Sequence, residues 1–97
     1  MTFYGQYALK YCFARFEEGG ETGLDGRIMM RACEDIAAGW GEEPLVFFLP
    51  DSEVLTGQMW YDAFKNNALS LVEQYAEIEL AERYPASYLL LSMLGEI

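Results

Sequence analysis

The 97-residue sequence contains no histidine and only two cysteines, Cys12 and Cys33. Without histidine, the chain lacks the side chain that most often transfers protons near neutral pH, so Ser-His-Asp and Cys-His catalysis are excluded within it. Two thiols without imidazole also fall short of a structural zinc site. We therefore expect two reduced, partly buried cysteines, no metal site, no cofactor and no enzymatic activity.

Long apolar runs are also missing. The longest are Leu45–Leu49 and Tyr88–Leu91, well short of the roughly 20 residues that a membrane-spanning helix requires. The N-terminus lacks the basic segment followed by an apolar stretch that directs export. These absences favour a cytoplasmic protein. Hydrophobic residues nevertheless make up 53% of the chain, which suffices for one buried core, so we expect residues 1–97 to form a single domain.

Basic residues are scarce, and the acidic residues are unevenly distributed. The chain has 16 acidic and 6 basic residues, for a net charge of −10. Residues 1–31 contain four acids and four bases, so residues 32–97 carry the whole excess, with 12 acids against Lys65 and Arg83. Such a field repels nucleic acid and anionic membranes and attracts basic proteins. We therefore expect a basic protein partner, with no direct binding to nucleic acid or membrane.

The spacing of apolar residues predicts a long amphipathic helix over residues 57–83, with Thr56 as its N-cap. A stripe that repeats every three to four residues forms the buried face: Trp60, Phe64, Ala68, Leu71, Tyr75 and Ile78. The opposite face is polar: Asp62, Asn66, Ser70, Glu73 and Glu77. Asparagine is a poor helix former, so a break at Asn66–Asn67 would give two helices.

Two shorter helices are expected on either side of the long one. Residues 26–38 follow Asp25, a candidate N-cap. Their predicted buried stripe repeats every four residues: Ile28, Ala32, Ile36 and Trp40. Tyr84-Pro85 ends the long helix, because the residue before a proline is pushed out of the α region. The apolar residues 86–94 then form a short packed helix.

Residues 7–16 and 44–49 are predicted to form a small sheet, which makes the expected fold α+β. In the first segment aromatic and aliphatic residues alternate with others, although a helix with Gln6, Lys10, Ala14 and Glu17 on its polar face also fits. The second is a continuous apolar run next to Pro50, typical of a buried strand. Each strand needs the other as its partner. The alternative is therefore an all-α fold, with a short helix at 44–49.

Carboxylates are the candidate partner-binding groups. Between Asp62 and Glu73 the polar face of the long helix spans about 16 Å, at about 1.5 Å of rise per residue. Carboxylates along such a length can imitate the phosphates of a nucleic-acid backbone. The ordinary alternative is a solvated face that keeps the domain soluble. The predicted partner-binding residues are Glu34, Asp35, Glu42, Glu43, Asp62, Glu73 and Glu77.

In overall character the chain resembles the small phage or plasmid proteins that block host nucleases, such as anti-CRISPR and anti-restriction inhibitors. The resemblance rests on short length, strong acidity and the lack of histidine, and it assigns no role to any particular residue. It implies a stoichiometric inhibitor of a basic, nucleic-acid-handling host protein. The alternative is an acidic adaptor or homodimer, joined through Leu45–Leu49 or the apolar tail Tyr88–Leu94. An enzyme that uses carboxylates and a divalent metal ranks last.

Overall fold

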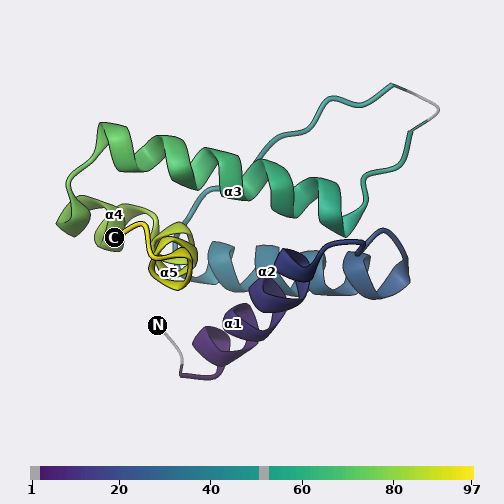
Figure 1. The fold of residues 1–97 in the computed structure, drawn as a ribbon, viewed down its shortest axis with the longest axis horizontal. Coiled ribbons are helices and arrows are strands. Elements are labelled where there is room, and N and C mark those ends of the chain that lie inside the picture. The colour runs from purple at the N-terminus through teal and green to yellow at the C-terminus, as the bar shows by residue number, and fades with distance from the viewer. Residues whose placement is uncertain (1–2, 51–52) are drawn as a thin grey trace.

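The computed structural model describes residues 3–50 and 53–97, and the regular secondary structure of these ranges is entirely helical. Within them five helices follow one another (Figure 1): α1 (Phe3–Glu18), α2 (Leu24–Gly39), α3 (Gly57–Gln74), α4 (Glu77–Arg83) and α5 (Pro85–Leu94). The predicted α+β fold is therefore wrong, and the all-α alternative fits. Neither 7–16 nor 44–49 is a strand.

The first predicted strand is part of α1, because packing against the other helices decides the conformation of this segment. The buried side chains recur every three to four residues, as in a helix: Leu9, Cys12, Phe13 and Phe16. The ring of Phe13 lies 5.6 Å from that of Phe64 in α3. A strand would have buried Tyr7 and Tyr11 on the same face as Phe13, and both tyrosines are exposed.

The second predicted strand, residues 44–49, is also not the short helix of the alternative. It lies in the connection between α2 and α3, which swings out beyond the start of α3 in Figure 1. Leu45 and Phe47 pack against the core, whereas Val46 and Phe48 are exposed. Because α1 is helical, the segment has no neighbouring strand, and the two side chains that it turns inward pack against the helical core instead.

α3 is the helix around which the others pack, since it contacts each of the other four. The predicted apolar stripe is confirmed over its length: Trp60, Phe64, Ala68 and Leu71 are buried. Thr56 is confirmed as the N-cap, because its hydroxyl accepts a 3.1 Å hydrogen bond from the backbone N–H of Met59. Within the described ranges, no helix combines the length and apolarity needed to cross a bilayer.

The predicted helix over 57–83 is divided, but not at Asn66–Asn67. Tyr75 and Ala76 have extended backbone angles (ψ 147° and 153°), which end α3 and allow α4 to begin in a new direction. The apolar stripe predicted from a single helix therefore fails beyond this point, and Ile78 is exposed.

α2 confirms the helix predicted at 26–38 but turns a different face inward. Its buried residues are Gly26, Met29, Cys33 and Ala37, one position after the predicted stripe, and Ile28 is exposed. This face is fixed where α2 meets α3, because a Cβ atom on Gly57 of α3 would overlap the backbone of Gly26, and a Cβ atom on Gly26 would overlap the carbonyl group of Glu21. Both positions therefore need glycine. Asp25 is not the N-cap; that position is Gly23.

Cys12 and Cys33 are both free and buried, as expected of reduced thiols. They are distant in sequence but lie on neighbouring helices, α1 and α2, where each thiol shifts the pKa of the other. The neighbouring Cys33 lowers the pKa of Cys12. The neighbouring Cys12 and burial raise the pKa of Cys33.

Burial predicts that neither thiol reacts readily with a disulfide reagent such as DTNB while the protein is folded. Both should react at the rate of free cysteine in denaturant. Cys12 should be modified before Cys33, because its pKa is the lowered one of the pair. Peptide mapping after timed alkylation measures the order. Modification of Cys33 first, or equal rates in folded and unfolded protein, would contradict this account.

Candidate functional site

The ion pairs leave the acidic part of the chain unneutralised. Among the described residues two ion pairs form, Arg15–Glu21 at 3.0 Å and Lys65–Glu17 at 2.8 Å. Both use acids from residues 1–31, and the second takes one of the two bases of residues 32–97. The other base, Arg83, lies over the ring of Tyr75 at 5.9 Å. No described acid of residues 32–97 therefore has an ion-pair partner.

Glu17 holds α1 against α3. Its Oε2 accepts hydrogen bonds from the hydroxyl of Tyr61 at 2.6 Å and the ammonium group of Lys65 at 2.8 Å. Lys65 first, and then Tyr61, lower the pKa of Glu17. Burial and the neighbouring Glu17 raise the pKa of Tyr61. This carboxylate is committed to the fold, which leaves the outer acids for recognition.

The predicted partner-binding residues separate into groups. Glu34, Glu42 and Glu43 line one small pocket of about 40 Å³ beside α3 and Tyr84. Glu34 is half-buried, and this burial raises its pKa. Asp35 follows it on α2 and is exposed. Glu34, Glu42 and Glu43 therefore lie close together although they are not in one helix.

Asp62, Glu73 and Glu77 are exposed, as predicted for the polar face. Asp62 accepts a 3.1 Å hydrogen bond from the side-chain amide of Gln58, and Glu77 accepts a 3.0 Å bond from the hydroxyl of Tyr88. Because Glu77 begins α4 rather than continuing α3, only Asp62 and Glu73 share one helix.

Glu42 differs from the other acids, because it is only 6% exposed. Its Oε1 accepts hydrogen bonds from the backbone N–H groups of Ala86 at 2.8 Å and Ser87 at 3.2 Å. Its Oε2 accepts a 2.6 Å bond from the Ser87 hydroxyl. α5 begins with Pro85 and has no N-cap side chain of its own. Glu42 supplies this cap from a distant part of the chain, so its carboxylate is not open to a partner.

Burial raises the pKa of Glu42, and the hydrogen bonds from Ser87 and Ala86 partly oppose that rise. The ionised form costs free energy because it is removed from water. At the same time, the positive end of the α5 dipole and the three donors favour a negative charge at this position. Glu42 is therefore a structural residue whose ionised form is disfavoured by burial and favoured by its hydrogen bonds.

A groove of about 450 Å³ joins the end of α2 to α4, and we call it the acidic groove. It is lined by Trp40, Gly41, Glu43, Glu82, Arg83 and Tyr84. Glu43 and Glu82 are exposed. The left-handed turn at Gly41 (φ +89°) lets the chain reverse after α2 and brings Glu43 to the groove.

Two carboxylates, Glu43 and Glu82, outnumber the one cation of the acidic groove, Arg83, so its chemistry suits a cationic side chain. Trp40 and Tyr84 are half-buried, so each leaves part of an aromatic side chain at the surface. Aromatic faces attract lysine and arginine, and a carboxylate adds a charge-assisted hydrogen bond. The pKa of Tyr84 is raised, chiefly by Tyr75 and also by Glu43, which indicates that Glu43 lies near this ring.

Glu82, Trp40 and Tyr84 are not among the predicted partner-binding residues. The sequence pattern places Trp40 in the buried stripe of α2, Tyr84 at a helix end among the tyrosines available to an interface, and Glu82 near the end of the acidic face. The available signal was the position of both aromatics at helix ends, next to Gly41 and Pro85, where side chains of different elements meet.

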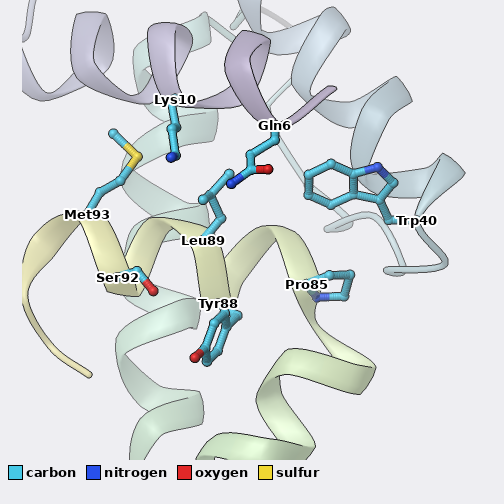
Figure 2. Close-up of a pocket in the computed structure, with 8 residues that line it drawn as sticks. All are labelled: Gln6, Lys10, Trp40, Pro85, Tyr88, Leu89, Ser92 and Met93. Carbon is cyan, nitrogen blue, oxygen red and sulfur yellow. The ribbon is translucent and has the colours of Figure 1, made fainter. Parts of the chain in front are cut away.

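A second groove of about 410 Å³ lies between α1 and α5 (Figure 2). It is lined by Gln6, Lys10, Trp40, Pro85, Tyr88, Leu89, Ser92 and Met93. Gln6 and Lys10 point from α1 towards α5 in Figure 2. Lys10 is the charged residue of this lining. Trp40 lines both grooves, so the two meet at one aromatic side chain.

Within residues 3–50 and 53–97, no group of three or more Cys, Asp or Glu side chains is arranged to hold a metal ion. In comparisons with protein-family models, curated proteins and solved structures, nothing matches this chain.

Proposed function

We propose that this protein acts by stoichiometric binding to a basic protein, and that the acidic groove receives a lysine or arginine side chain of that partner. The observation that carries the proposal is the absence of ion-pair partners for the described acids of residues 32–97. The negative charge of these acids is not neutralised by ion pairs within the molecule. It is available to accelerate association with a positively charged surface.

The groove gives the partner's side chain a specific binding site, which a diffuse acidic surface does not provide. Exposed ion pairs contribute little, because both charges remain solvated. A cation between Trp40 and Tyr84 is partly desolvated and meets the carboxylates of Glu43 and Glu82. Aromatic residues in such positions often dominate binding energy.

The partner we propose is a nucleic-acid-handling host protein in the cytoplasm, which the chain inhibits by occupying its basic surface. Nucleic-acid-binding proteins carry clustered basic residues on one face, and their ligands are polyanions. The exposed carboxylates of Asp62 and Glu73 extend the negative surface along α3. This proposal predicts competition between the protein and duplex DNA or RNA.

The test compares two variants of equal net charge. Glu43→Lys with Glu82→Lys alters the acidic groove. Glu18→Lys with Asp25→Lys alters two exposed acids on α1 and α2, outside it. Each pair changes the net charge from −10 to −6. The immobilised proteins are incubated with bacterial lysate, washed at about 0.05 to 0.5 M salt, and challenged with duplex DNA. Retained proteins are identified and their affinities are then measured with purified components.

We expect a basic nucleic-acid-binding protein to be retained at low salt and released by salt or DNA. The groove variant should bind it at least about tenfold more weakly, while the α1–α2 variant retains most of the affinity. Equal weakening by both variants would assign recognition to net charge and remove the groove from the proposal. Affinity unchanged by the groove variant, or a partner indifferent to salt, would refute it.

A further inference from the structure

Residues 44–50 expose large apolar side chains on one side of an extended segment. Phe48 is 92% exposed and Val46 is 76% exposed. On the other side Leu45, Phe47 and Leu49 are half-buried, and the first two of these pack against the core. Burial therefore alternates from residue to residue, which is the pattern of a strand with one face on a protein body and the other in water.

The backbone of residues 45–49, the middle of this segment, makes no hydrogen bond within the described ranges. In the part of the chain that the structure describes, no bond joins the N–H or C=O groups of residues 45–49 to any other group. The nearest backbone bond runs from the N–H of Glu53 to the carbonyl of Pro50. An apolar extended segment with free donors and acceptors is a template for pairing with another strand.

The sequence of this segment is nearly the same in both directions. Reading outward from Phe47, Val46 matches Phe48, Leu45 matches Leu49, and Pro44 matches Pro50. An antiparallel pair of identical strands related by a two-fold axis brings such positions opposite each other. Because neither proline has an N–H, each limits the ladder at its end.

We propose that residues 44–50 pair with the same segment of a second copy of this chain, as an antiparallel ribbon centred on Phe47. Val46 of each copy then lies opposite Phe48 of the other, and the two side chains cover each other. These residues carry no charge, so they form a stretch at which two chains of net charge −10 can approach. The apolar tail, the other surface considered for self-association, is unsuited, because Leu90 and Leu91 are fully buried in α5.

The expected dimer is weak. A ladder of five residues with two exposed apolar side chains per copy buries less than the roughly 800 Å² per partner of a standard interface. We expect a dissociation constant on the order of 10–100 µM. Salt should strengthen this dimer, since it screens the repulsion between two acidic copies. The proposed binding to a basic partner has the opposite salt dependence, so the two proposals succeed or fail separately.

Sedimentation of the full chain from about 1 µM to 1 mM tests the proposal over that affinity range. Phe48→Asp places a charge at the exposed centre of the ribbon without touching the core. Tyr4→Asp is the matched control, because Tyr4 is also an exposed aromatic, at 89%, but lies on α1. Circular dichroism establishes that both variants keep the helical fold.

We expect Phe48→Asp to weaken the dimer by about tenfold or more and Tyr4→Asp to leave it unchanged. A wild-type chain that stays monomeric at about 1 mM, or a dimer that persists in Phe48→Asp, would overturn the proposal. A mixture of Val46→Cys and Phe48→Cys chains reports the register. Mixed disulfides should outnumber those between identical chains, and a preference for identical chains would exclude the ribbon centred on Phe47.

Discussion

Replacing Glu42 with alanine is expected to lower the free energy of unfolding by about 3–5 kcal/mol. The substitution removes the acceptor of three hydrogen bonds at once. The donors belong to Ala86 and Ser87, both fully buried, and are left without a partner. A domain of this size is stable by about 5–15 kcal/mol in total, so the loss is large. Denaturant unfolding followed by circular dichroism measures it.

Glu42→Gln is the matched control, because it keeps the shape and a carbonyl oxygen for the two backbone N–H groups. Its amide donates to the Ser87 hydroxyl instead of accepting from it, so we expect a loss of about 1 kcal/mol at neutral pH. An alanine variant as stable as the glutamine variant would contradict the role of Glu42 as the cap of α5.

The same pair of proteins tests the charge of Glu42. Burial raises its folded-state pKa above the ordinary value of 4.5, so the folded protein binds this proton more tightly than the unfolded chain does. The resulting stabilisation is complete below pH 4.5 and is lost as pH rises through the raised pKa. Wild type should therefore lose stability relative to Glu42→Gln above pH 4.5. A difference that does not vary with pH would contradict the raised pKa.

Gly57→Ala is the second change with a large expected effect. A Cβ atom at this position would overlap the carbonyl group and Cα of Gly26, where α3 crosses α2. The obstacle is backbone, which cannot move aside like a side chain. Separating the helices would also strain two hydrogen bonds of Gln58. Its backbone N–H donates to the carbonyl of Glu21 at 3.0 Å, and its side-chain amide donates to the carbonyl of Phe16 at 3.1 Å.

We expect Gly57→Ala to cost about 4 kcal/mol or more, which places it among the most damaging single substitutions. Gly39→Ala is the control. No atom lies within 4 Å of the added Cβ at Gly39, which ends α2, so the change should be neutral or stabilise by up to about 1 kcal/mol. Thermal unfolding of the two variants distinguishes them. Comparable melting temperatures would show that α2 and α3 do not need this close approach.

The sequence predicted secondary structure and burial best where the pattern of apolar residues lies within a single helix. The stripe of α3 from Trp60 to Leu71 is regular and begins at a true cap, Thr56. α1 was missed because Tyr7 and Tyr11 are apolar enough to suggest a strand face, yet they are exposed. α2 was found with the wrong face inward, since the deciding contact between Gly26 and Gly57 joins residues far apart in sequence.

The site was predicted in part for the same reason. Exposure of Asp62 and Glu73 follows from the period of α3, which the sequence displays. The burial of Glu42 cannot be read from a local pattern, because it depends on packing against the uncapped start of α5, 44 residues later in the chain. The acidic groove likewise needs both the end of α2 and α4, so no single segment of the sequence displays its aromatic walls, Trp40 and Tyr84, as one site.

The long-range side-chain bonds divide the chain into two interdependent parts. Among the described residues, such bonds join residues 3–43 to the α3–α5 part: Glu17 to Tyr61 and Lys65, Phe16 and Glu21 to Gln58, and Glu42 to Ala86 and Ser87. The described part of the connection around residues 44–50 contributes none of them. The covalent link between the two parts is thus separate from the bonds that hold them together, which is the arrangement that permits complementation between two fragments of one chain.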